Sequence, residues 1–121
     1  MLVVAKQEIE AMLERIMDQI PETEGLLAVD AKGRKLSGQT ITEMDHDAII
    51  KAVTALFKAS TEVSTNVEKG EVNEIRINSS DGYIIVVGSK KLILIGITGL
   101  DAVNSVSLIG RNLHMILEKF G

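Results

Sequence analysis

The sequence of 121 residues contains no cysteine. That absence excludes disulfides, thiol nucleophiles, iron–sulfur clusters and cysteine-ligated zinc, and it is compatible with a reducing compartment. Aromatic residues are scarce as well, since only Phe57, Tyr83 and Phe120 are present, and the net charge is -4. Proteins that bind single-stranded nucleic acid need aromatic side chains and a basic groove. We therefore expect no nucleic-acid partner.

Long hydrophobic runs are absent too. No stretch of the sequence approaches the ~20 apolar residues that cross a bilayer, so we expect no direct insertion into a membrane. Residues 1–4 are too few for the apolar region of a signal peptide, and we expect a cytoplasmic protein. The length fits a single domain, residues 1–121, which can bury roughly two-thirds of its unfolded surface without a metal or a disulfide.

The most informative segment is a pair of apolar runs, YIIVV at residues 83–87 and LILIGI at residues 92–97. Only a four-residue link joins them, so the two strands must pair as an antiparallel hairpin, because a parallel return needs a crossover of about a dozen residues. Antiparallel strands with one face in water alternate apolar and polar residues, and these strands do not. Both faces of the sheet are therefore predicted to be covered by helices.

The remaining pattern predicts the order helix, two strands, helix, three strands, helix. Apolar residues at helical spacing mark the first helix, which Pro21 ends. Thr42 or Asp45 caps the second helix, and Gly70 closes it. The expected strands are residues 25–30, 35–39, 72–78, 83–87 and 92–97. The fold class is α/β of the α+β type, an antiparallel sheet between layers of helices.

The middle helix carries two stripes of apolar residues. The expected core face consists of Ile49, Val53, Leu56, Ser60, Val63 and Val67. The second stripe consists of alanines, on which a neighbouring helix can approach closely: Ala48, Ala52, Ala55 and Ala59. The last helix, from about Asp101, has a larger expected buried side: Val103, Val106, Ile109, Gly110, Leu113, Ile116, Leu117 and Phe120.

No motif points to catalysis. His46 lies between two aspartates at a helix start, where successive side chains diverge, so we interpret it as part of a polar first turn and not as a metal ligand. His114 is interpreted as a partly buried structural histidine. The serines lack the nucleophile-elbow pattern, and residues 96–99 lack a Walker A lysine and are read as a strand end plus a helix cap. We expect no catalytic residue, no metal and no cofactor.

Two segments and the order of elements together carry a family resemblance. The segments are GLLAVDAKGR at residues 25–34 and EIRINSSDGYIIVVGSKKLILIGIT at residues 74–98, with the alanine-rich helix between them. Over essentially its whole length the chain resembles the Roadblock family, the superfamily of dynein light chains and small-GTPase regulators. Longin and profilin-like folds, which also flank a sheet with helices, are the nearest alternatives.

The resemblance implies a three-layer sandwich. A five-stranded antiparallel sheet would carry the middle helix on one face and the N- and C-terminal helices on the other. It further implies a homodimer, or a heterodimer with a paralogous Roadblock domain, in which the third strands pair edge to edge and the middle helices pack antiparallel. Family members act as scaffolds and as regulators of Ras-like small GTPases, and some are light chains on motor complexes.

The third strand offers an independent check on a dimer. It contains no proline to block pairing with another chain. If it pairs with its own copy about a two-fold axis at Ile75, Glu74 faces Arg76 of the partner subunit. The alternative is that the alanine stripe rests on the protomer's own sheet and that Glu74 and Arg76 are solvated. The predicted dimer interface is Ala48, Ala52, Ala55, Ala59, Glu74, Ile75 and Arg76.

Three functions are compatible with this sequence. The leading hypothesis is a non-catalytic dimeric scaffold that binds and modulates a Ras-like small GTPase by shape and charge complementarity. Arg34 and Arg111 are candidates for an arginine finger, but no feature of the sequence singles out either. The second hypothesis is a structural adaptor of the motor or membrane-complex type, without a GTPase. The third is a small-ligand sensor, which requires a cavity of a few hundred cubic ångströms, whereas the aliphatic core suggests a filled interior.

Overall fold

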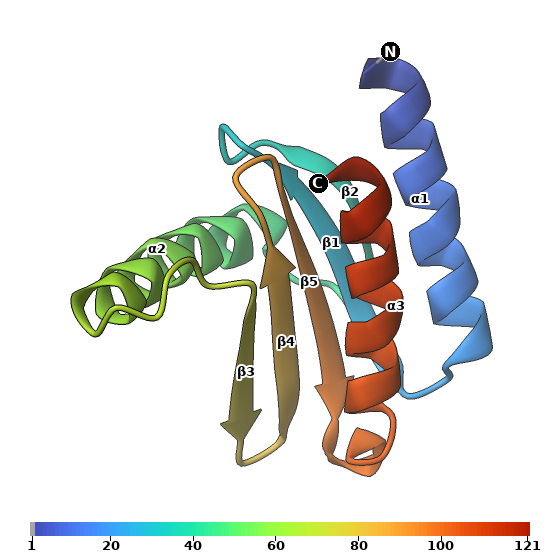
Figure 1. Ribbon diagram of the computed structural model, residues 1–121. Coiled ribbons are helices and arrows are strands. Elements are labelled where there is room, and N and C mark those ends of the chain that lie inside the picture. The colour runs from blue at the N-terminus through green and yellow to red at the C-terminus, as the bar shows by residue number, and fades with distance from the viewer. Residues whose placement is uncertain (1) are drawn as a thin grey trace.

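The computed structural model describes residues 2–121, with the side chains of residues 2–4 and 102 excepted. Its elements follow the expected order (Figure 1). The helices are α1 (Leu2–Gln19), α2 (His46–Asn66) and α3 (Val106–Phe120), and a short 3-10 helix, η1 (Leu100–Ala102), precedes α3. The strands are β1 (Thr23–Asp30), β2 (Lys35–Thr40), β3 (Glu74–Ser79), β4 (Gly82–Gly88) and β5 (Leu92–Gly99).

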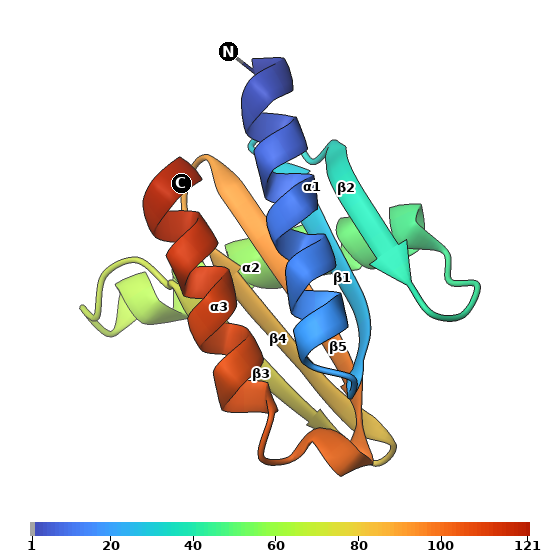
Figure 2. The same ribbon diagram turned by 90° about the vertical axis from the view of Figure 1, so that its right-hand side faces the viewer.

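The five strands form one antiparallel sheet in the order β2-β1-β5-β4-β3. The predicted hairpin of the two apolar runs is β4 and β5, and β5 and β1 lie in the middle of the sheet. Helices α1 and α3 cover one face, and α2 runs across the strands on the other face (Figures 1 and 2). Helical cover on both faces explains why β4 and β5 lack alternation, and the predicted three-layer sandwich is confirmed.

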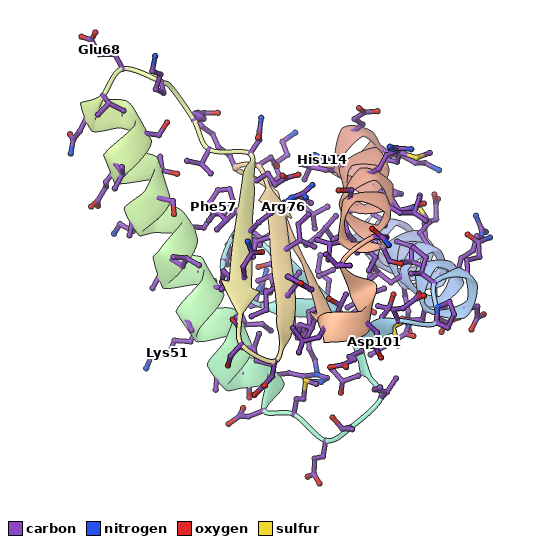
Figure 3. The ribbon with its side chains drawn as sticks, turned by 90° about the horizontal axis from the view of Figure 1, so that it is seen from below. Lys51, Phe57, Glu68, Arg76, Asp101 and His114 are labelled. Carbon is purple, nitrogen blue, oxygen red and sulfur yellow. The ribbon has the colours of Figure 1, made fainter. Side chains whose placement is uncertain are left out.

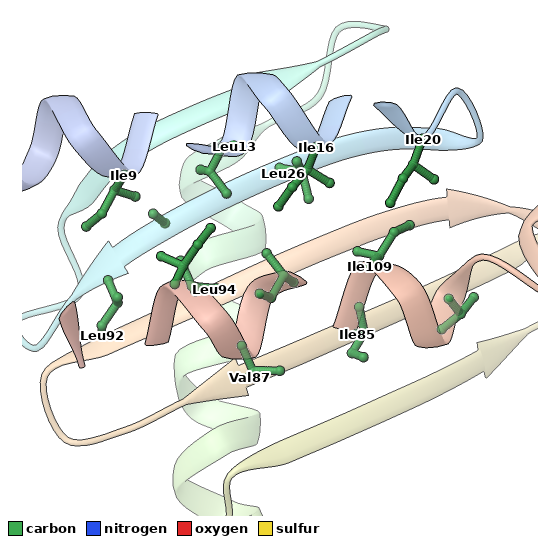
Figure 4. Packing of buried hydrophobic residues seen from close by; sticks show 14 residues of the cluster. Ile9, Leu13, Ile16, Ile20, Leu26, Ile85, Val87, Leu92, Leu94 and Ile109 are labelled. Carbon is green, nitrogen blue, oxygen red and sulfur yellow. The ribbon is translucent and has the colours of Figure 1, made fainter. Parts of the chain in front are cut away.

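The face under α1 and α3 holds the larger core (Figure 4). Leu13 of α1 and Leu113 of α3 are fully buried against the sheet. Gly110 lets α3 approach closely, because a Cβ there would lie 2.5 Å from Cδ1 of Ile85. The cluster comprises Ile9, Leu13, Ile16, Ile20, Leu26, Ala28, Ile85, Val87, Leu92, Leu94, Val106, Ile109, Leu113 and Ile116.

The face under α2 holds a smaller core. Phe57 of α2 packs against it, and Gly88 makes the space, because a Cβ at Gly88 would lie 2.8 Å from the Phe57 ring. Figure 3 shows Phe57 between α2 and the sheet. The cluster comprises Leu27, Val29, Ile50, Val53, Val86 and Ile95.

Both ends of α2 can be compared with the sequence-based expectation. Asp45 is the N-cap, since its Oδ1 accepts a hydrogen bond of 3.1 Å from the backbone N–H of Ala48. The prediction that Gly70 closes the helix is wrong, because the helix ends at Asn66. Glu68 takes the left-handed conformation (φ 59°), and the N–H groups of Glu68 and Lys69 bond to the carbonyls of Thr65 and Ser64 in a Schellman motif.

The start of the last helix was also predicted too early. Helix α3 begins at Val106, because the chain first turns through η1 and a further three residues. Val103, expected on the buried side, is 61% exposed as a result. Residues 96–99 form the end of β5, and Gly99 is the N-cap of η1, as expected of a strand end plus a helix cap.

Candidate dimer and partner interface

The alanine stripe of α2 faces solvent in the protomer. Ala48, Ala52, Ala55 and Ala59 are all exposed, whereas Ile50 and Val53 on the opposite side of the helix are buried. The alternative in which the stripe rests on the protomer's own sheet is therefore contradicted. An exposed strip of methyl groups is smooth enough for another helix to approach closely.

The C-terminal part of α2 extends beyond the sheet. In Figures 1 and 2 it projects past the edge strand β3. The prediction that Val63 and Val67 are core residues is wrong, because the two side chains are 65% and 58% exposed. The helix is instead anchored by Ile50, Val53 and Phe57, a set at helical spacing. The predicted core face included Val53 but missed Ile50 and Phe57.

Strand β3 forms an open edge of the sheet, since β4 is its only paired neighbour among the described residues. The N–H of Gly88 bonds to the carbonyl of Asn73 at 3.1 Å, which fixes the alternation of bonds along the β3–β4 pair. Ile75 therefore bonds toward β4, while the backbone groups of Glu74 and Arg76 point to the open edge. These groups are available to another strand.

The side chains of Glu74 and Arg76 lie on the α3 side of β3 and are already paired within the chain. Arg76 Nε donates to Glu74 Oε2 at 3.0 Å, and Arg76 Nη1 donates to Ser107 Oγ at 3.2 Å. His114 Nε2 lies 2.8 Å from Glu74 Oε1 (Figure 3 labels Arg76 and His114). The alternative that Glu74 and Arg76 are solvated is only partly met, because Arg76 is exposed and Glu74 half-buried but both are paired within the chain. His114 is half-buried with a defined structural partner, as expected.

The Glu74 carboxylate is stabilised in its charged form. Partial burial alone would raise its pKa, but the hydrogen bonds from His114 and Arg76, together with their charges, outweigh it and lower the pKa below its ordinary value. Sequence reasoning missed both Ser107 and the contact with His114, because forty residues separate His114 from Glu74 and no periodic pattern relates them.

Two other residues considered for chemistry, His46 and Arg34, have structural partners. His46 joins the start of α2 to β2, with Nδ1 3.2 Å from Lys35 Nζ and Nε2 3.2 Å from Thr40 Oγ1. Arg34 forms an ion pair of 3.0 Å with Asp30. Within the described part of the chain, no three histidine or acidic side chains are grouped as metal ligands. No helix among the described residues is long and apolar enough to cross a membrane.

Both a known protein family and several solved structures match this chain. The model of the Roadblock/LC7 domain matches residues 9–98. No curated protein sequence matches the chain.

Solved structures share the fold at low sequence identity. Myxococcus xanthus MglB has a TM-score of 0.74 at 16% identity, over 94% of this chain and 90% of that chain. A Roadblock/LC7 domain from Streptomyces avermitilis has a TM-score of 0.76 at 13% identity, over 91% and 92% of the two chains. The gliding protein MglB of Thermus thermophilus has a TM-score of 0.73 at 18% identity, over 89% of each chain.

Proposed function

The chain belongs to the Roadblock/LC7 family, and from that premise we propose that residues 1–121 form a cytoplasmic, non-catalytic dimeric scaffold that binds and modulates a Ras-like small GTPase. The proposal rests on two surfaces that the described part of the protomer leaves uncovered: the exposed alanine stripe of α2 and the open edge of β3. The GTPase is proposed from the family alone.

Self-association would cover the alanine stripe of α2 and pair the open edge of β3 at the same time. Two β3 strands that pair about an axis at Ile75 place Glu74 opposite Arg76 of the partner subunit, and the groups that point to the open edge belong to these two residues. The end of α2 that carries the exposed Val63 and Val67 extends past β3 (Figure 1), on the side where the strand of the second copy would pair. A paralogous Roadblock domain with the same edge and helix is the other partner that this geometry accepts.

The GTPase would dock on the face that carries both α2 helices. Antiparallel packing of these helices makes one continuous surface from two protomers, on the side of the sheet away from α1 and α3 (Figure 2). Such a surface acts by shape and charge, and the protein supplies no nucleophile to the GTPase.

Substitution of the alanine stripe tests the dimer. Ala55→Arg places a long charged side chain on the stripe, and we expect light scattering to give the 13.1 kDa mass of one chain instead of twice that mass. Thr54→Arg is the matched control, because Thr54 is an exposed neighbour that lies off the stripe. A dimer of unchanged mass in Ala55→Arg would contradict the proposed interface.

Nucleotide dependence tests the GTPase. The immobilised protein is incubated with source lysate that contains either GDP or a non-hydrolysable GTP analogue, and retained Ras-like GTPases are quantified by mass spectrometry. We expect retention in one nucleotide state to exceed the other by about tenfold, the differential affinity that a conformational regulator needs. Equal retention, or none, would instead support a structural adaptor.

A further inference from the structure

A groove of about 570 Å³ lies among the start of α1, the end of α3 and two strand turns. These elements meet at the end of the molecule opposite the free end of β3, away from the C-terminal end of α2 (Figures 1 and 2). The groove is bounded by the N-terminal half of α1, the β1–β2 turn, the β4–β5 turn and the end of α3. Its volume is within the range of small-molecule sites. The groove lies at the margin of the larger core, because the core residues Ile9 and Leu92 are part of its lining.

The floor of the groove is apolar. Ile9 and Leu92 are buried members of the large core, and Leu36 and Phe120 pack against that core while remaining partly exposed. Ala5 completes the floor from α1. An alkyl chain placed here would cover aliphatic and aromatic surface that water otherwise contacts.

The rim is cationic in a chain whose net charge is -4. Five of the 13 lysine and arginine residues line the groove, against one of the 17 carboxylates. That carboxylate, Asp30, is occupied, because it accepts hydrogen bonds from the backbone of Lys32 and from the backbone and Nε of Arg34. The five rim cations are Lys6, Lys32, Arg34, Lys35 and Lys91.

Three of these cations are available to a ligand. Among the described residues, no carboxylate forms an ion pair with Lys6, Lys32 or Lys91. All three side chains are exposed, and their flexible stems let the ammonium groups reach a charge above the floor. Among the described residues that line the groove none is a glycine, so the lining offers no glycine-rich loop that would select a phosphate group by geometry.

We propose that this groove binds a long-chain monoanionic amphiphile of the free fatty acid class. The alkyl chain lies on the floor of Ala5, Ile9, Leu36, Leu92 and Phe120, and Lys6, Lys32 and Lys91 hold the charged head. The two requirements, an apolar chain and a single negative head, follow from an apolar floor enclosed by point charges of one sign.

The probe is laurate, titrated into the full chain below its critical micelle concentration and followed by amide chemical shifts. We expect saturable binding at one site per chain, with shifts concentrated at residues 5–9, 30–36, 91–92 and 120. Dodecyltrimethylammonium, which has the same chain with a positive head, and acetate, which has the head without the chain, are expected not to saturate the site. Binding of either as tightly as laurate would overturn the proposal.

Charge reversal on the rim provides the decisive variant. Lys32→Glu with Lys91→Glu is expected to weaken laurate binding about tenfold or more. Lys58→Glu with Lys69→Glu makes the same change of net charge at exposed positions outside the groove, and its affinity is expected to stay within about twofold of the native value. Equal weakening by both variants would show a non-specific charge effect and overturn the site.

A variant of the groove floor distinguishes an alkyl chain bound in the groove from electrostatic attraction to the cationic surface. Ala5→Trp fills the groove without removing a cation, and we expect it to abolish saturable laurate binding while the circular dichroism spectrum is retained. Phosphatidylglycerol vesicles serve as the second probe. Binding to vesicles without saturable binding of laurate would identify a membrane-surface patch and would contradict a single-chain site.

Discussion

The hydrophobic cores on the two faces of the sheet differ in size. Among the residues that the structure describes, fourteen buried residues form one core under α1 and α3, whereas six form the core under α2. Two amphipathic helices direct their apolar sides at the first face, but α2 crosses the second face and leaves it, so that its outer stripe and its C-terminal end stay exposed (Figure 1). The difference indicates that the α1/α3 face contributes most of the core of one protomer, and it supports our proposal that the α2 face serves association.

The largest expected effect comes from making the same substitution, leucine to alanine, on each face of the sheet. Leu113→Ala removes a fully buried side chain under α3 and is expected to lower the free energy of unfolding by about 3 kcal/mol. Leu56→Ala on α2 removes a partly exposed side chain and is expected to cost about 1 kcal/mol. Urea unfolding measures both, and equal losses would contradict the division between the faces.

A second change separates the open edge of β3 from its side chains. Arg76→Pro removes an N–H that points to the open edge, so we expect the dimer to dissociate while each protomer stays folded. Arg76 is chosen for this test in place of Ile75. The N–H of Ile75 bonds to β4, so proline at Ile75 would disrupt the sheet of the protomer itself. Arg76→Ala keeps the N–H and is the control. Light scattering that shows the same dimer for both variants would exclude edge pairing.

The third prediction concerns acid stability at the same edge. Because the pKa of Glu74 is lowered in the fold, its carboxylate stabilises the protein fully above the ordinary glutamate pKa of about 4.3, and this contribution is lost as the pH falls through the lowered value. Glu74→Gln lacks the titrating group and should show a shallower loss of stability below pH ~4.3. Urea midpoints measured from pH 6 to pH 3 compare the two. Parallel curves would show that the contacts with His114 and Arg76 do not persist in solution.

The smallest expected effect is at the projecting end of α2. Glu68 adopts a left-handed conformation that glycine accepts without steric cost, so Glu68→Gly is expected to raise the free energy of unfolding by about 0.5 to 1 kcal/mol. Glu71→Gly, at an exposed position after the motif, is the control and should give no gain. A lower unfolding midpoint in Glu68→Gly would show that the Schellman motif does not form.

Much of the fold was predictable because it depends on local patterns. The lack of alternation in β4 and β5 predicted cover on both faces, and Asp45 had the side chain of an N-cap. The alanine stripe was also visible as a spacing, although only the structure shows that it faces solvent.

The errors arose where local pattern does not determine the outcome. Val63 and Val67 continue a helical spacing, but a sequence does not show how far a helix extends beyond its sheet. Glu68 carries no signal for the left-handed conformation, which is usual for glycine, so the later Gly70 was chosen. The contacts of Glu74 with His114 and of Arg76 with Ser107 depend on how α3 docks beside β3, which no spacing within one segment encodes.

The mass of the native protein in solution tests the central claim most directly, because the claim is that the α2 stripe and the β3 edge pair with a second copy. Light scattering across a hundredfold range of concentration is the measurement. We predict twice the 13.1 kDa of one chain at the higher concentrations, with dissociation only at the lowest. A mass of 13.1 kDa at every concentration would contradict self-pairing.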